Sequence, residues 1–326
     1  MSTRVLIVGG LGFIGANLAK YLAEQGEKVF ITQHRSSANP SYLRTIVGEK
    51  VQAISFDILN LDRIRSTIQE YEISTIFNLA SVYEPKADLY QAFHVNVQGQ
   101  INLLEVMRLE GVRKIIFASS VAVYRGITGA KLVGETHPIP VEPVTNIITA
   151  TKRAAEAMSI LYADVYGIDS IMVRIGNVYG PFYTASLPPS SLRNPMLTMV
   201  KNAAQGISTR VPLSERTRYD YIYVKDLVRG LGLLHSRYPL KYRIYNIGGG
   251  KAVSIAEVAE VIRNLVPGVK IDFESGEPGS ESKKFVEGKE FAMDISRIKQ
   301  ELDYVPEFSL EQGIRSFIQW FREGDY

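Results

Sequence analysis

The chain has 326 residues, the length of about two domains or of one large α/β domain with an appended region. Its 37 Lys and Arg residues nearly balance 34 Asp and Glu residues, and the net charge of +3 argues against nucleic-acid binding through a dense basic face. The sequence has no cysteine and four histidines, none of them paired at i, i+4 spacing. Disulfides, thiolate nucleophiles and cysteine-ligated zinc are therefore excluded, and we expect no bound metal.

No segment of the sequence is typical of a membrane span or a secretion signal. The apolar run Val5–Val8 is too short for the core of a signal peptide, and no later run reaches the roughly 18 apolar residues that a bilayer requires. We therefore expect a soluble, cytoplasmic protein.

Short apolar runs alternate with amphipathic stretches in the first half of the chain. The predicted strands are Val5–Val8, Val29–Ile31, Val51–Ile54, Thr75–Leu79, Lys114–Ala118 and Ser170–Arg174. The predicted helices are Ile14–Gln25, Tyr42–Val47, Leu61–Glu70, Ala87–Glu110 and Asn146–Tyr166. Fully apolar strands that alternate with helices predict a doubly wound, parallel α/β sheet of the Rossmann type.

The pattern changes after Asn177, where prolines become frequent and the predicted elements shorter. We expect helices near Pro195–Gln205, Asp226–His235, Ser254–Leu265 and Leu310–Phe321, a strand near Tyr219–Tyr223, and loops at Phe182–Asn194 and Ser275–Gly288. The expected dinucleotide-binding domain comprises residues 1–176 and returning segments near 219–248. Residues 177–218 and 249–326 are expected to form a smaller, interleaved substrate-binding domain.

A glycine-rich turn follows the first strand and precedes the first helix. Gly9, Gly12 and Gly15 form a G-x-x-G-x-x-G pattern that encloses Phe13 and Ile14. Glycines in such a turn permit positive φ and let backbone N–H groups approach a pyrophosphate at the helix N-terminus. In this strand–turn–helix context the pattern predicts a dinucleotide site formed by these five residues.

Further motifs, in order along the chain, resemble the extended short-chain dehydrogenase/reductase family, which includes nucleotide-sugar epimerases and dehydratases. They are Phe56-Asp57-Ile58, Asn78-Leu79-Ala80-Ser81, Asn96-Val97-Gln98-Gly99, Ala118-Ser119-Ser120, Arg174 to Pro181 (RIGNVYGP) and Tyr245-Asn246-Ile247-Gly248. The resemblance covers nearly the whole chain. It implies cofactor contacts from Asp57, Ile58, Leu79, Ala80, Ser81, Asn96 and Ile175. It also implies a nucleotide-sugar substrate and a homodimer formed through a four-helix bundle by the helices Ala87–Glu110 and Asn146–Tyr166.

The end of the second strand bears on the choice between NAD and NADP. An acidic residue there would bind the adenosine ribose and favour NAD, but the position is Gln33. Arg35 and Ser36 follow and offer charge-assisted hydrogen bonds to a 2′-phosphate. The sequence therefore favours NADP slightly over NAD.

The family pattern also implies a catalytic Ser, Tyr and Lys, in which the Lys lowers the pKa of a proton-transferring Tyr and binds the nicotinamide ribose. Ser120 and Lys152 match the Ser and the Lys. The residue four positions before Lys152, where the Tyr is expected, is Ile148. Isoleucine has no titratable proton, so another group must carry the proton or the chemistry is reduced.

Several substitutes for the missing tyrosine remain open. Thr145 and Thr149 share the helical face of Lys152, although a Thr hydroxyl is a poor base. Tyr83, just after the fourth strand, is a candidate from a loop, and Tyr183 is a candidate from the substrate side. A carboxylate, a water molecule or the substrate itself is a further option.

The substrate side departs from the family pattern as well. Asn177 matches the family Asn that contacts the substrate diphosphate, and Tyr183 follows the same motif. The family then has an Arg where this chain has Tyr219, and Arg218 stands one residue earlier. We expect Asn177, Tyr183 and Arg218 to bind substrate.

The loop after Ser120 bears on the reaction type. Family 4,6-dehydratases carry acidic residues just after the catalytic hydroxyl, but Val121, Ala122 and Val123 occupy this loop. Dehydration is therefore disfavoured, and an epimerase or dehydrogenase that transfers hydride between a sugar carbon, C4, and nicotinamide is expected. The alternatives are an NADPH-dependent 4-ketoreductase and a catalytically weak or inactive dinucleotide-binding module.

Overall fold

The computed structural model describes residues 3–34, 48, 50–82, 88–144, 146–183, 195–211, 218–273 and 291–324. The predicted helix Tyr42–Val47 and most of both predicted loops lie outside these ranges. None of the helices described is both long enough and apolar enough to cross a bilayer.

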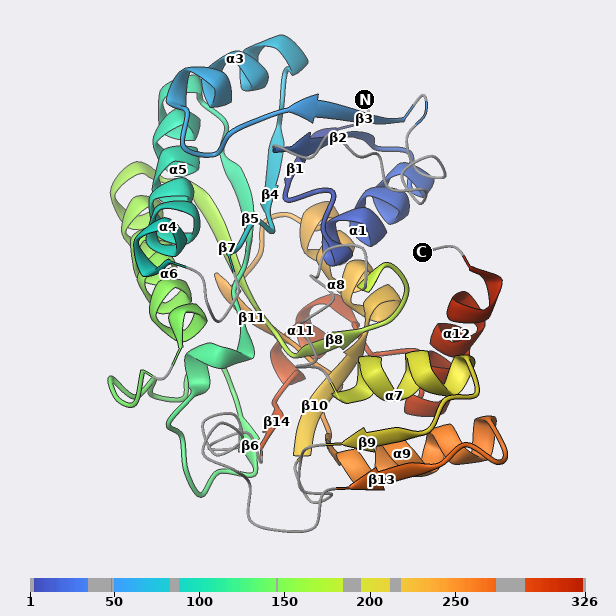
Figure 1. Cartoon of the computed structure of the whole chain (residues 1–326). Coiled ribbons are helices and arrows are strands. Elements are labelled where there is room, and N and C mark those ends of the chain that lie inside the picture. The colour runs from blue at the N-terminus through green and yellow to red at the C-terminus, as the bar shows by residue number, and fades with distance from the viewer. Residues whose placement is uncertain are drawn as a thin grey trace.

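The centre of the molecule is a seven-stranded parallel sheet with the strand order β11-β7-β5-β4-β1-β2-β3 (Figure 1). The strands are β1 (Arg4–Val8), β2 (Lys28–Gln33), β3 (Val51–Ser55), β4 (Thr75–Asn78), β5 (Lys114–Ala118), β7 (Asp169–Ile175) and β11 (Ile244–Ile247). The chain turns to opposite sides of β1, which confirms the predicted doubly wound α/β fold.

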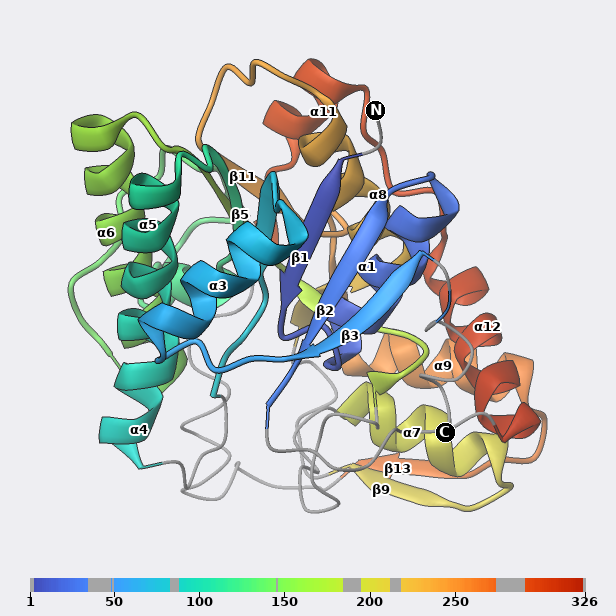
Figure 2. The same ribbon diagram turned by 90° about the horizontal axis from the view of Figure 1, so that it is seen from above.

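Helices cover both faces of this sheet (Figure 2). One face is covered by α3 (Leu61–Tyr71), α5 (Gly99–Glu110) and α6 (Ile147–Tyr166), and the other by α1 (Phe13–Glu24) and α8 (Val224–Ser236). Both faces of the central strands are therefore buried, which explains why the sequence of β1 is apolar at successive positions.

The smaller part of the molecule is built from short strands and helices below the carboxyl ends of the large sheet in Figure 1. A three-stranded sheet has the order β12-β10-β8, and two parallel strand pairs join β13 to β9 and β14 to β6. The strands are β6 (Leu132–Val133), β8 (Asn177–Tyr179), β9 (Thr209–Val211), β10 (Arg218–Tyr223), β12 (Ala252–Ser254), β13 (Ile271–Phe273) and β14 (Ala292–Met293). The helices are α7 (Pro195–Ala204), α9 (Ile255–Leu265), α11 (Ser296–Leu302) and α12 (Leu310–Glu323).

The two parts share one hydrophobic core. A single buried cluster runs from the β1 face of the large sheet through α8 to α7, α9 and α12. The segment 219–248 was expected to return to the large sheet. Its strand β11 does so and its helix α8 packs on that sheet, whereas its strand β10 lies in the three-stranded sheet. The chain therefore crosses between the two parts more than once.

The predicted helix Ala87–Glu110 is interrupted in the structure. It consists of α4 (Leu89–Phe93), a π-helical turn (His94–Gln98) and α5. A Cβ atom on Gly99 would come within 2.8 Å of the Ile58 side chain, so the glycine lets α5 approach the loop after β3 closely. The prediction of one continuous helix was therefore wrong, because the 3.6-residue hydrophobic pattern does not reveal a π-helical turn.

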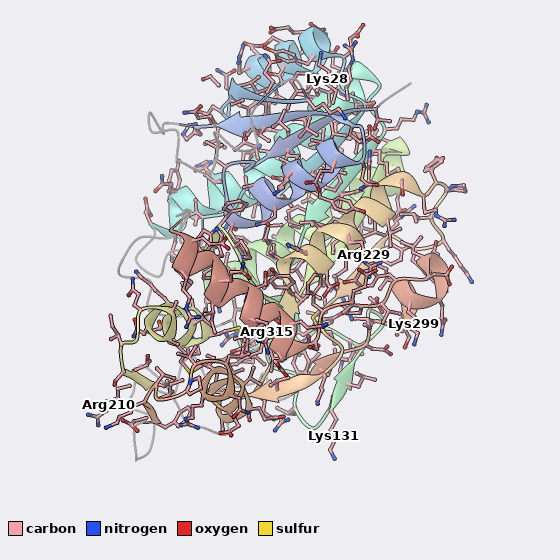
Figure 3. The ribbon with its side chains drawn as sticks, turned by 90° about the vertical axis from the view of Figure 1, so that its right-hand side faces the viewer. Lys28, Lys131, Arg210, Arg229, Lys299 and Arg315 are labelled. Atoms are coloured by element: carbon pink, nitrogen blue, oxygen red, sulfur yellow. The ribbon has the colours of Figure 1, made fainter. Side chains whose placement is uncertain are left out.

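Basic side chains are spread over the surface rather than gathered on one element. Figure 3 shows one face of the molecule. On this face Lys28 and Arg229 lie on the part that contains the large sheet, and Arg210 and Lys131 lie near the lower edge of the view.

Candidate active site

The predicted glycine turn packs tightly against the end of β4. Gly9 has φ +82°, and the Gly12 N–H donates a hydrogen bond of 3.0 Å to the Gly9 carbonyl. A Cβ atom on Gly9 would lie 2.8 Å from the Ala80 nitrogen, and one on Gly15 would lie 2.4 Å from the Gly9 oxygen. Only glycine therefore fits these two positions.

The same turn presents the N-terminus of α1. Gly12 is the N-cap of this 12-residue helix, and no side chain caps it. Among the described residues, a Cβ atom on Gly12 would meet only the Gly9 oxygen, at 3.2 Å, so none of their side chains fills the space beside this N-terminus. Uncapped first-turn N–H groups beside an unfilled space fit the pyrophosphate of a dinucleotide.

The predicted adenosine side lies where β2 and β3 end. The Asp57 carboxylate accepts a hydrogen bond of 3.0 Å from Leu59 N–H, and the Ile58 carbonyl accepts one of 3.1 Å from the Asn102 amide. Both residues are thereby held at the sheet edge. Gln33 is the last residue of β2, whereas Arg35 and Ser36 lie outside the described residues.

Asn96 is buried in the π-helical turn and fixes the loop after β4. Its side-chain oxygen accepts from Val82 N–H at 2.7 Å, and its amide donates to the Val82 carbonyl at 3.0 Å and to Thr151 Oγ1 at 3.2 Å. The structure thus assigns Asn96 a role in positioning the segment just before Tyr83, which itself lies outside the described residues. The other predicted cofactor residues end neighbouring strands: Leu79, Ala80 and Ser81 follow β4, and Ile175 closes β7.

Ser120 lies two residues beyond the end of β5 and begins a 3-10 turn (Val121–Tyr124). Its hydroxyl oxygen accepts a hydrogen bond of 3.1 Å from Ala122 N–H, and the residue is half-buried. The cap fixes the hydroxyl at the same sheet edge as the glycine turn, because parallel strands end together.

Lys152 reaches the same edge from the second turn of α6. Its Nζ atom donates a hydrogen bond of 2.6 Å to the Ala118 carbonyl and lies 4.6 Å from the centre of the Phe117 ring. The residue is 4% exposed. Burial lowers the pKa of Lys152 to about 8, and the nearby Glu156 carboxylate acts in the opposite direction.

Two other positions on α6 bear on the missing tyrosine. Ile148 is buried and apolar. The hydroxyl of Thr149 is fully buried and donates to the Ala122 carbonyl at 3.3 Å and to the Asn146 side chain at 3.1 Å. Thr149 therefore links the first turn of α6 to the serine loop (Ser120–Tyr124). Thr145 lies outside the described residues.

The three predicted substrate residues lie in different settings. Asn177 begins β8 and donates to the Asp220 carbonyl at 3.2 Å. Tyr183 packs edge-on against Phe13 of the glycine turn, with ring centres 4.7 Å apart. Arg218 donates to the Ala252 carbonyl at 2.8 Å and pairs with Glu257 at 3.1 Å, so its guanidinium holds the start of α9.

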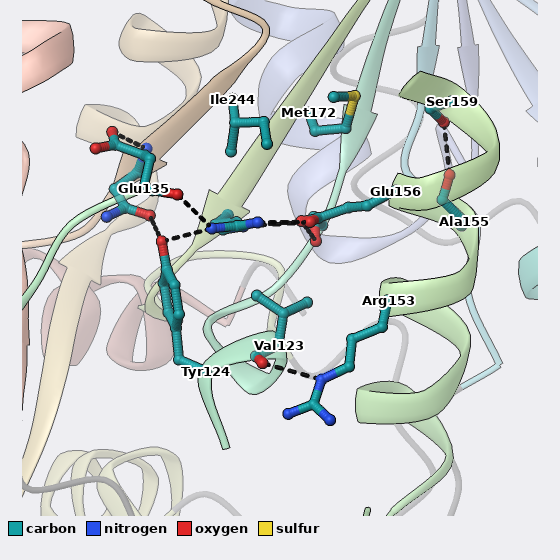
Figure 4. Close-up of polar contacts among 12 residues, drawn as sticks. Val123, Tyr124, Glu135, Arg153, Ala155, Glu156, Ser159, Met172 and Ile244 are labelled. Atoms are coloured by element: carbon teal, nitrogen blue, oxygen red, sulfur yellow. Dashed lines mark hydrogen bonds and ion pairs between the residues drawn. The ribbon is translucent and has the colours of Figure 1, made fainter. Parts of the chain in front are cut away.

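Sequence reasoning missed a buried polar network behind the serine loop (Figure 4). Arg174 and Glu156 form an ion pair at 2.8 Å with 3% and 4% of their side chains exposed. Glu156 also accepts a hydrogen bond of 2.5 Å from Ser119, and Arg174 donates one of 2.9 Å to the Tyr124 hydroxyl. The Tyr124 hydroxyl in turn donates to Asn246 at 2.8 Å. One signal was available, since Arg174 interrupts the apolar run Ile171–Ile175 within β7.

The fold defines an α/β protein of the Rossmann type, with the glycine turn, Ser120 and Lys152 at the carboxyl edge of its large sheet. The sequence matches the profile of the NAD dependent epimerase/dehydratase family over residues 5–248. The chain belongs to this family, which confirms the resemblance inferred from its motifs. Among the described residues, no group of three or more His, Asp or Glu side chains is placed to hold a metal ion.

The chain is similar to known proteins in sequence and to a solved structure in fold. The chain is 28% identical to a UDP-glucuronate 4-epimerase of Thermodesulfobacterium geofontis over 98% of its own length and 96% of that protein. It is 27% identical to a UDP-glucose 4-epimerase of Corynebacterium glutamicum over 93% and 91% of the two chains. The crystal structure of a Thermotoga maritima UDP-glucose 4-epimerase with UDP-glucose superimposes with a TM-score of 0.83, 22% identity and 99% coverage of both chains.

Proposed function

We propose that this chain is an NAD(P)-dependent enzyme that acts on nucleotide sugars as an epimerase or a dehydrogenase. In this proposal a hydride passes between C4 of the sugar and the nicotinamide. Membership of the family supports the cofactor class, and the 4-epimerases among the relatives support the substrate class and the carbon. The three residues after Ser120 are Val121, Ala122 and Val123, none of which is acidic, and this argues against a 4,6-dehydratase.

One observation carries the proposal. The glycine turn, Ser120 and Lys152 come from separate parts of the sequence and meet at the carboxyl edge of one parallel sheet, where α/β proteins bind their ligands. When bound, a nicotinamide supplies the hydride acceptor. Ser120 can then hold the reacting oxygen, and Lys152 contributes a buried amine that is hydrogen-bonded to Ala118, two residues before Ser120.

Replacing the serine hydroxyl tests this arrangement. Ser120→Ala removes one hydrogen bond to the reacting oxygen, and we expect turnover to fall at least tenfold, or about 1.4 kcal/mol in activation free energy. The matched variant Ser66→Ala removes an exposed hydroxyl that bonds only its own helix, through the Arg63 carbonyl, and should leave turnover unchanged. Equal turnover of Ser120→Ala and the native chain would remove Ser120 from the mechanism.

The residue that ends β2 leads us to propose NADP over NAD. We expect the native chain to bind NADP at least as tightly as NAD, and Gln33→Asp to shift the ratio of the two Kd values at least tenfold, about 1.4 kcal/mol, toward NAD. The reason is that a carboxylate accepts hydrogen bonds from a ribose diol but repels a 2′-phosphate. Titration calorimetry with both dinucleotides measures this ratio, and an unchanged ratio would refute the placement of Gln33.

We further propose that two copies pair through α5 and α6. These helices lie side by side on the outside of the molecule (Figure 1), and large apolar side chains on them are exposed: Leu109, Leu161, Val165 and Tyr166. Exposed apolar clusters of this kind are typical of protein interfaces. A solution mass twice the chain mass of 36.4 kDa is the expected result of sedimentation equilibrium, and a monomer at micromolar concentration would contradict it.

A further inference from the structure

Four titratable side chains lie on the two elements that form the serine loop and its neighbour, the start of α6. On the 3-10 turn after Ser120 and on the first three turns of α6, the described titratable side chains are Tyr124, Lys152, Arg153 and Glu156. The position expected for the family tyrosine is occupied by Ile148, which is buried and apolar.

Three of these four groups are fully engaged in structural contacts. The Tyr124 hydroxyl is held between Arg174 and Asn246, and burial raises its pKa. Arg153 donates hydrogen bonds to the carbonyls of Val123 and Arg125. A guanidinium does not lose its proton at neutral or mildly alkaline pH. These contacts leave neither group available for proton transfer.

Glu156 is engaged in the same way. Its carboxylate accepts hydrogen bonds from both the Nε and a terminal nitrogen of Arg174, and from the Ser119 hydroxyl. Charge-assisted hydrogen bonds of this kind hold the carboxylate against Arg174 and Ser119. It therefore acts on the site through its charge rather than by exchanging a proton.

Lys152 differs because a backbone carbonyl is its hydrogen-bond acceptor. Its Nζ atom bonds to the Ala118 oxygen, two residues before Ser120. A neutral amine still has N–H groups to donate, so this contact persists after the ammonium loses a proton. The lysine can therefore change protonation state without moving.

We propose that Lys152 accepts and returns the proton of the sugar hydroxyl held by Ser120, the role that the family pattern gives to a tyrosine. This proposal rests on the proposed function. In oxidation the sugar C–H bond breaks and its hydride passes to the nicotinamide carbon. The hydroxyl O–H bond breaks as well, its electron pair forms the second C–O bond, and its proton passes to the neutral amine of Lys152. Reduction reverses each of these transfers.

The surroundings of Lys152 set the direction of its pH dependence. From β5 it faces the Phe117 ring and the Ala118 carbonyl; from its own helix it faces the Glu156 carboxylate, which is paired with Arg174 of β7. Burial lowers the pKa of Lys152 to about 8. Because the neutral amine is the proton acceptor, the oxidation rate should rise with pH and level off above this value.

The first experiment measures the lysine itself, without cofactor or turnover. In the protein labelled with carbon-13 at the lysine ε carbon, a signal that is missing from Lys152→Met should titrate near pH 8. Glu156→Gln should lower that midpoint by about one pH unit, because the anion that stabilises the ammonium is lost. A Lys152 signal that titrates near the ordinary value of about 10.4 would overturn the proposal.

The second experiment measures the pH profile of sugar oxidation. Glu156→Gln should move the rising limb to lower pH by the same amount, and Lys152→Met should abolish the limb while binding of the dinucleotide is retained. Tyr83→Phe and Tyr183→Phe remove the two other candidate tyrosine hydroxyls; the rate can change in either variant, but the rising limb should stay at its native pH. A limb that persists in Lys152→Met or disappears in Tyr83→Phe would assign the proton to another group. Failure of all variants to bind a dinucleotide would instead refute the proposed function, while the titration of Lys152 would still be measurable.

Discussion

Arg174→Met is expected to lower the free energy of unfolding by about 3–5 kcal/mol, because it leaves the carboxylate of Glu156 buried without a cation. The ion pair is almost inaccessible to water, with 3% and 4% of the two side chains exposed. The substitution also removes the hydrogen bond that Arg174 donates to the Tyr124 hydroxyl. Chemical denaturation followed by circular dichroism measures the change.

Two further variants separate burial from charge. Arg315→Met breaks an exposed i, i+4 pair with Glu311 and should cost less than about 1 kcal/mol. The double variant Arg174→Met with Glu156→Met removes the unpaired charge and should recover part of the stability lost in Arg174→Met alone. A double variant that is less stable than the single one would show that packing, rather than the uncompensated charge, dominates at this site.

Gly15→Ala is expected to weaken dinucleotide binding about 100-fold or more, close to 2.7 kcal/mol. Its Cβ atom would lie 2.4 Å from the Gly9 oxygen and 2.7 Å from the Gly10 Cα, so the turn must open to accept it. An opened turn moves the N–H groups at the start of α1 away from the pyrophosphate. The affinity for the dinucleotide is measured by calorimetry.

Gly48→Ala is the matched control, because no atom of the described residues lies within 4 Å of the Cβ atom that it would add. It should bind the dinucleotide as the native chain does. Gly15→Ala is also expected to lose about 1–3 kcal/mol of stability through overpacking, although alanine is the better helix former. Native affinity in Gly15→Ala would show that the turn does not hold the pyrophosphate.

The sequence was sufficient to predict the large sheet, and the reason is physical. Strands buried on both faces must be apolar throughout, so β5 was predicted with the bounds that the structure has, Lys114–Ala118. The strands of the smaller part are two to six residues long and depend on contacts between distant segments. Pairs such as β14 with β6, whose residues are about 160 positions apart, leave no local pattern to read.

The site was predictable where a backbone conformation demands a residue type, as at Gly9 and Gly15. It was less predictable where side chains choose among partners. The sequence shows Arg218 beside the family Arg position, but only the structure shows that its guanidinium is paired with Glu257. The pairing of Arg174 with Glu156 likewise depends on two elements that meet behind the serine loop.

The most direct test of the account is transfer of a labelled hydride. The purified chain is incubated with NADP or NAD and with UDP-glucose or UDP-glucuronate that carries deuterium at C4, and the nicotinamide is recovered for mass spectrometry. The account predicts that deuterium appears in the reduced nicotinamide, and that the label in Ser120→Ala accumulates at least ten times more slowly. A chain that binds both the dinucleotide and the nucleotide sugar, yet transfers no deuterium over hours, would contradict the account and identify a binding module without catalytic activity.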